Sequence, residues 1–241
     1  MISHGSPVQL FPILRRVEWT FAEISELPWL SHIFTGKLEH QNILHAQESS
    51  FDARGASYEH SLESTLITLV NVSARLRYLH LPVPSGVSGL SQGYQDMYIR
   101  AITSNPSLRT VTVPVLPGIL EILGRLQNLI TLTLHFHKDT AVDEETDTDG
   151  AFSCLLDLSV KDVALLDHVT KHLVSNGCFP SRSLNIECIM TPDSDEIALF
   201  LLEVLPKFEL SFNQFSLRIP PVHLEVSSIR CYHILPWKYS K

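Results

Sequence analysis

The sequence predicts an α/β solenoid, a single domain over residues 1–241 with a curved parallel sheet on the concave side and helices outside. Three observations predict this fold. Segments beginning at Leu76, Leu108, Leu129 and Leu155 share the pattern L-x-x-[LV]-x-[LV]. Between these segments the apolar spacing changes from two to about 3.6. The pattern recurs about every 28 residues, inside the range typical of repeat arrays.

Three weaker segments extend the pattern toward both ends of the chain. LRRVEW, from Leu14, ends in Trp19 where an aliphatic residue is usual. The segments from Ser181 and Gln214 keep only the last two apolar positions. Each is expected to form one more strand of the same sheet.

Short amphipathic helices are expected between the strands. Leucine, isoleucine and valine recur at helical spacing in 61–72, 117–126 and 162–174, and a further helix is expected around 94–103. Asn176-Gly177 is a typical helix stop signal. Two further features are an acidic loop at 139–150 and an irregular C-terminal tail at 220–241.

A unit of one short strand and one short helix cannot bury its apolar faces alone, so successive units are expected to stack. If the fourth and sixth residues of each segment point into the core, the third and fifth point outward, onto the concave sheet. A solvated sheet face is polar in any protein, but solenoids use such concave surfaces for binding. The partner-binding candidates are therefore Arg16, Glu18, Tyr78, His80, Thr110, Thr112, Thr131, Thr133, Asp157, Ser159, Ser183, Asn185, Ser216 and Arg218.

These segments resemble leucine-rich repeats of the ribonuclease-inhibitor-like kind, and more narrowly the degenerate repeats of fungal F-box proteins. The narrower likeness rests on LFPILRRVEW, on LPWLSHIF followed by TGKL-x-x-x-x-I, and on SNPSLRTVTV-x-VLPGILEILGRLQNLITLTL. The resemblance implies the substrate-recruiting region of an SCF-type ubiquitin ligase. An F-box itself is not seen, so a ligase adaptor is an expected partner only if an F-box lies upstream.

The chain departs from that family where a strand normally ends in asparagine or cysteine. The corresponding residues are Pro84, Leu116, His137 and Val163, so no asparagine ladder is expected and the turns should be irregular.

Charge and composition exclude several functional classes. The net charge of −8 and the absence of a lysine or arginine run argue against nucleic acid as a partner. No apolar run is long enough to cross a bilayer, which predicts a cytoplasmic or nuclear protein without membrane attachment. The four cysteines lack C-x-x-C spacing and are expected to be buried thiols.

The stretch GLSQG, residues 89–93, fits the G-x-S-x-G pattern of a nucleophile elbow with Ser91 as the nucleophile. Such an elbow turns directly off a strand, whereas a loop rich in proline and glycine separates Leu81 from Ser91. A connector is therefore the favoured interpretation, and a hydrolase is the less favoured alternative.

Two groups of residues suggest metal ligands. Glu145, Asp147 and Asp149 match positions 1, 3 and 5 of a calcium loop, but position 12 is Leu156 where a glutamate is needed. His135 and His137 lie two apart at a strand end, but no third histidine or cysteine is near in sequence. Neither metal nor cofactor is therefore expected, and the calcium-binding module remains an alternative.

The sequence predicts a non-catalytic module that binds a protein of unknown identity, with Tyr78, His80 and Arg218 as preferred contacts because aromatic residues and arginine dominate interface energetics. The alternatives are a generic repeat scaffold or a truncated gene product without a ligase role. The oligomeric state, the cation-binding capacity of the acidic loop and the existence of a longer native chain are left open.

Overall fold

The computed structural model describes residues 14–21, 37–45, 67, 75–80, 92–136, 152–190, 192, 194–204 and 214–219. The chain is an α/β protein whose eight strands form one open sheet in the order β1 to β8. Every strand pair with a defined register is parallel. The chain divides into two compact units, Met1–Val113 with Leu126–Leu129, and Pro114–Arg125 with Ile130–Lys241. The α/β class and the parallel pairing predicted from sequence are confirmed.

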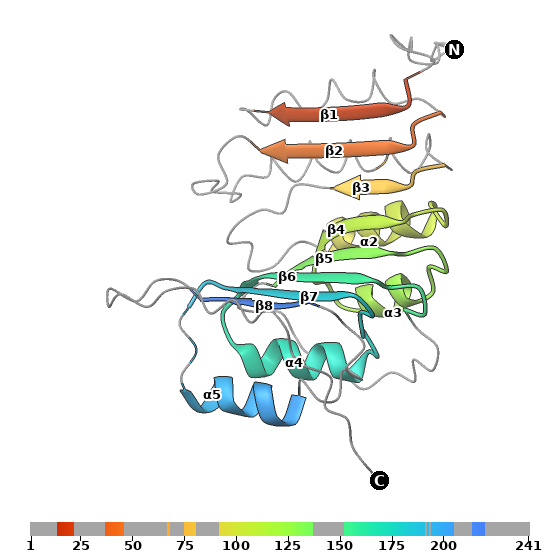
Figure 1. The fold of residues 1–241 in the computed structure, drawn as a ribbon. Helices are drawn as coiled ribbons and strands as arrows, with labels where there is room; N and C mark the ends of the chain where they lie inside the picture. The colour runs from red at the N-terminus through yellow and green to blue at the C-terminus, as the bar shows by residue number, and fades with distance from the viewer. Residues whose placement is uncertain are drawn as a thin grey trace, which may run out of the picture. The chain divides into compact units, whose positions relative to one another are not determined.

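The first unit holds strands β1 (Arg16–Phe21), β2 (His40–His45), β3 (Tyr78–His80) and β4 (Thr110–Pro114). Helix α2 (Gln92–Thr103) connects β3 to β4 (Figure 1). Strand β2 carries the polar residue Gln41 where β1 and β3 carry Val17 and Leu79.

The register of the first unit aligns equivalent residues of successive turns. Val17, Gln41, Leu79 and Val111 form one row across the four strands, and all are buried. Of the leucines that open these segments, Leu38, Leu76 and Leu108 are fully buried and Leu14 is half-buried. At about 1.5–3 kcal/mol for each fully buried leucine, these rows supply the main stabilising term of the unit.

The second unit holds β5 (Thr131–His135), β6 (Asp157–Val163), β7 (Ser183–Cys188) and β8 (Gln214–Arg218). Its helices are α3 (Ile119–Gly124), α4 (Leu166–Ser175) and α5 (Ser194–Leu199), and a π-helical turn, η2 (Phe200–Val204), continues α5. Helices α4 and α5 lie on one side of strands β6 to β8 (Figure 1).

The core of the second unit repeats the alternation of the first. Leu132, Leu158 and Leu184 form one buried row, and Leu134, Val160 and Ile186 form the next. The predicted apolar faces of the helices are confirmed, because Ile119, Leu120 and Leu123 of α3 and Leu166, Val169 and Leu173 of α4 are all buried. Gly177, at φ 59°, follows the end of α4 as the Asn176-Gly177 signal predicts.

One backbone arrangement recurs where the strands begin. The carbonyl oxygen of the residue just before a strand accepts two hydrogen bonds, from the N–H of the residue just before the next strand and from the N–H of that strand's first residue. Arg15 O accepts from Glu39 N (2.9 Å) and His40 N (3.0 Å), and Leu156 O accepts from Arg182 N (2.8 Å) and Ser183 N (3.0 Å). The arrangement persists although 24 residues separate Arg16 from His40 and 38 separate His40 from Tyr78.

Two local features differ from the predictions. Val163 was placed on a helix, but it ends strand β6, and α4 begins three residues later. Strand β6 also has a register shift between Val160 and Val163, with Asp162 at φ 61°. A bulge of this kind makes room for one extra residue, so the strand continues past the predicted turn.

Several predicted elements fall outside the described residues. These are the 61–72 helix apart from the helical residue Ile67, the acidic loop at 139–150 and the tail at 220–241. In the part of the chain that the structure describes, no helix has both the length and the apolar character needed to span a membrane.

Candidate functional site

The candidate site is the sheet face that carries the third and fifth repeat residues, called the polar face below. Strand β3 shows the predicted alternation directly, because Leu79 is buried while Tyr78 and His80 on either side are half-buried. In the first unit the register aligns Arg16, His40, Tyr78 and Thr110 in one row and Glu18, Asn42, His80 and Thr112 in the next.

Four side chains from three strands form a contact cluster on the polar face of the first unit. Arg16 Nε donates a hydrogen bond to Glu18 Oε1 at 3.2 Å, and a second guanidinium nitrogen also contacts this oxygen. His40 Nε2 lies 3.6 Å from the same carboxylate oxygen. The His40 ring stacks on the Tyr78 ring, with centroids 4.1 Å apart and an interplanar angle of 17°. The cluster therefore joins a charged pair to a stacked pair of rings.

The charges of this cluster set the protonation states of its members. The hydrogen bond and charge of Arg16 lower the pKa of the Glu18 carboxyl. Burial lowers the pKa of His40, the positive charge of Arg16 lowers it further, and Glu18 opposes both effects. At neutral pH the cluster presents a neutral imidazole beside an ionised pair.

The polar face of the second unit centres on Asp157 in strand β6. Arg182 Nε donates to Asp157 Oδ1 at 2.7 Å, a second guanidinium nitrogen contacts Oδ2, and Ser183 Oγ donates to Oδ1 at 2.7 Å. These hydrogen bonds, with that of Arg182 the largest cause, lower the pKa of Asp157. The carboxylate is thus fully engaged within the protein.

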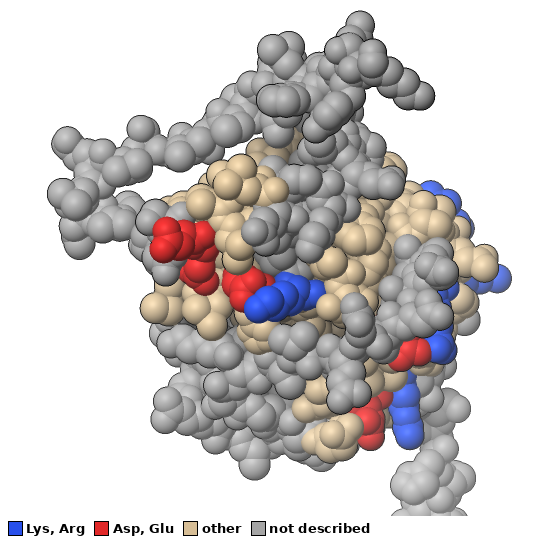
Figure 2. All heavy atoms as spheres, turned by 90° about the horizontal axis from the view of Figure 1, so that it is seen from below, with Lys and Arg blue, Asp and Glu red and all other residues tan. Residues whose placement is uncertain are grey.

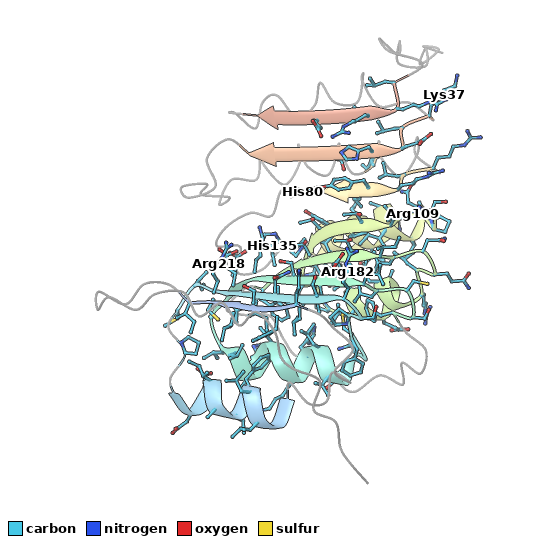
Figure 3. The ribbon with its side chains drawn as sticks, in the orientation of Figure 1. Lys37, His80, Arg109, His135, Arg182 and Arg218 are labelled. Atoms are coloured by element: carbon cyan, nitrogen blue, oxygen red, sulfur yellow. The ribbon has the colours of Figure 1, made fainter. Side chains whose placement is uncertain are left out.

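A second row on this face carries less tightly paired residues. Thr133, Ser159, Asn185 and Ser216 align in register, and Asn185 is exposed. Next to them, Glu187 Oε1 lies 3.9 Å from a guanidinium nitrogen of Arg218, which is itself exposed. Figure 3 labels Arg218 on β8 and His135 on β5.

Two of the predicted surface residues are buried. Thr112 is 5% exposed, and it lies in the unbroken buried run from Val111 to Leu116. Ser183 is 7% exposed and donates its hydroxyl to Asp157. Neither side chain is available to a partner.

Sequence reasoning missed two residues in register with the candidates, His40 and Asn42. The register places them between the residues of β1 and β3. The pattern search passed over β2 because Gln41 occupies the position where leucine or valine was required. Leu38 followed five residues later by Ile43 was noted in the resemblance, but it was not used to assign outward-facing residues.

The residues considered for catalysis and metal binding fall in different places. Ser91, His137, Asp139 and the acidic loop lie outside the described residues. His135 Nδ1 lies 2.7 Å from Asp162 Oδ2, which gives it a carboxylate partner. Among the residues that the structure describes, no group of three or more His, Cys, Asp or Glu side chains is arranged to hold a metal ion.

The cysteines follow the prediction only in part. Cys178 and Cys188 are buried, and burial raises the pKa of both thiols, that of Cys188 to about 11 with a contribution from the charge of Glu196. Cys154 is exposed, so the prediction of a buried thiol was wrong at that position. Cys231 lies outside the described residues.

The fold and the site thus define an α/β protein with a parallel sheet and a polar strand face. The chain matches no protein-family model, and a search of curated proteins finds no significant match.

Proposed function

We propose that the chain is a leucine-rich-repeat solenoid that acts as a non-catalytic protein-binding module, with the polar face lining a concave side. The recurring backbone arrangement at the strand starts supports a repeated unit, because one carbonyl accepts from the same two positions of the following turn in both units. Buried leucines at equivalent repeat positions support it further.

The cluster of Arg16, Glu18, His40 and Tyr78 is the observation that carries this proposal. Its side chains stand on paired strands, so little conformational freedom is lost when a partner binds. Tyrosine and arginine are also the residue types that dominate interface energetics. A peptide or loop crossing the sheet would meet a ring surface and a guanidinium within one row.

By the resemblance to fungal F-box proteins, this module would recruit substrates for an SCF-type ubiquitin ligase in the cytoplasm or nucleus. The ligase role requires an F-box joined to the chain. A generic protein-binding scaffold remains the alternative, and both roles use the same surface.

The test compares capture of partner proteins by the wild type and by variants of the cluster. Tyr78→Ala and His40→Ala should each weaken binding of a purified, captured partner by about tenfold or more, as expected for interface hot spots. The matched control is Lys171→Ala on α4, which removes an exposed side chain outside the polar face. Equal binding by all three variants would overturn the proposal.

Stability measurements keep this result interpretable. Loss of the His40–Tyr78 stack should cost only about 0.5–1.5 kcal/mol, so both variants should remain folded. Tyr78→Phe keeps the ring stack and removes only the hydroxyl, so it should fold with nearly the stability of the wild type.

A further inference from the structure

One residue lies directly before each strand in the first unit. It is the second residue of the repeat, and the sequence pattern assigns it neither to the core nor to the polar face. These residues are Arg15, Glu39, Arg77 and Arg109. Backbone hydrogen bonds connect them in this order, from Glu39 N to Arg15 O (2.9 Å), from Arg77 N to Glu39 O (2.8 Å) and from Arg109 N to Arg77 O (2.8 Å). Since neighbouring strands lie about 4.8 Å apart, the row spans roughly 14 Å.

This row and its surroundings form a basic edge, defined here as Arg15, Lys37, Arg75, Arg77 and Arg109. All five side chains are exposed. Figure 3 shows Lys37 and Arg109 extending from the end of the first unit at which the strands begin. The described residues of this unit include seven lysines and arginines against three aspartates and glutamates, although the whole chain has a net charge of −8.

The positive charges of the basic edge are only partly compensated. Arg15 lies 3.8 Å from Glu39. Arg77 and Arg109 directly precede the neighbouring strands β3 and β4, and among the described residues neither forms an ion pair with a carboxylate. Like charges directly opposite each other on adjacent strands are destabilising. The neighbouring guanidinium groups therefore favour an anion at this edge.

Several charges elsewhere in the described chain are paired. Lys171 lies 2.6 Å from Asp167, Arg125 contacts Glu121, and Arg182 contacts Asp157. In Figure 2, red and blue side chains lie next to each other at several places on the face shown. In the second unit, the second repeat position holds Ile130, Leu156 and Arg182, so a comparable row of cations does not continue there.

We propose that the basic edge binds an acidic segment of a partner protein. Guanidinium groups pair with carboxylates in bidentate geometry, and a row of about 14 Å matches an extended peptide with several carboxylates. Single-stranded nucleic acid is disfavoured, because its binders offer free aromatic faces to the bases. Here one face of each ring nearest the edge, His40 and Tyr78, is already covered by the other ring.

The inference is independent of the proposed role of the polar face. The edge residues lie at the second repeat position, and the polar face begins at the third. Variants of one surface leave the side chains of the other in place. Failure of one proposal is therefore distinguishable from failure of the other.

The experiment measures fluorescence anisotropy of a labelled polyglutamate peptide with the full chain at low and at physiological ionic strength. The double variant Arg77→Gln/Arg109→Gln should weaken binding by roughly fivefold or more, given the usual strength of exposed charge pairs. The matched control Arg125→Gln/Lys171→Gln changes the net charge equally with exposed cations of the second unit that lie outside both surfaces, and it should change binding less than twofold. Binding should weaken as salt rises.

Two further measurements identify the ligand class and guard against misfolding. Glu39→Gln removes the carboxylate within the row, and it should tighten peptide binding about two- to threefold. A single-stranded RNA of the same charge should bind more weakly than the peptide. Equal loss in both double variants, tighter binding of RNA, or no peptide binding by the wild type at low salt would each overturn the proposal.

Discussion

Gln41 offers a direct test of how the core of the first unit is held together. It is fully buried in the row that also contains Val17, Leu79 and Val111. Within the described part of the chain, neither its Nε2 nor its Oε1 has a hydrogen-bond partner. Each unsatisfied buried polar group costs about 1–3 kcal/mol.

Replacing Gln41 with leucine removes both polar atoms and keeps a similar volume. We therefore expect the free energy of unfolding to rise by about 2–4 kcal/mol. For a chain of this size, this corresponds to a rise in melting temperature of roughly 5–10 °C. Urea unfolding followed by circular dichroism measures the change, with an unchanged m-value as the sign that only stability has altered.

The matched control is Gln127→Leu, an exposed glutamine of the same unit. A surface substitution of this kind should change stability by no more than about 0.5 kcal/mol. A Gln41→Leu protein that is less stable than the wild type by about 1 kcal/mol would refute the reasoning. In that case the amide is hydrogen-bonded in solution, and the leucine removes a stabilising contact.

Three further outcomes are expected from titration and reactivity. Arg182 lowers the pKa of Asp157 in the folded state, so their interaction stabilises the protein at pH values above the unfolded pKa of about 3.9. This stabilisation is lost as the pH falls through the folded pKa of Asp157. Arg182→Gln should therefore reduce the fall in the free energy of unfolding at acidic pH, measured by urea unfolding at a series of pH values. The pKa of His40 is also lowered, so stability should fall as pH drops below about 6.5 through the folded pKa, and His40→Gln should reduce this dependence in the same assay. In native protein at pH 8, iodoacetamide should modify Cys154 and leave Cys178 unmodified, as peptide mass mapping would show; equal labelling would contradict the burial of Cys178.

The α/β class and the faces of most strands followed from apolar spacing alone. Leu79, Val111, Leu132 and Leu158 are buried as predicted because a period of two fixes which side of a strand is apolar. The same rule failed at Thr112, which lies within the apolar run VTVPVL. A continuous apolar run indicates a strand buried on both faces, and this signal was present in the sequence.

The candidate site was less predictable, because it depends on register between distant segments. His40 stacks on Tyr78 although 38 residues separate them, and no local pattern states that they are neighbours. Arg77 and Arg109 are likewise distant in sequence, and the pairing of β3 with β4 makes them neighbours on the basic edge. A search for runs of lysine or arginine could not detect residues that only the parallel pairing of strands brings together.

The unequal stretches of chain between successive strands have a practical consequence. The register between neighbouring strands is set by the hydrogen bonds at their first residues. It does not depend on the length of chain that connects the strands. Insertions that lengthen these connections should therefore be tolerated, since the entropic cost of loop closure rises only slowly with length. A reporter peptide inserted into the connection between β2 and β3 would leave the register of the neighbouring strands unchanged.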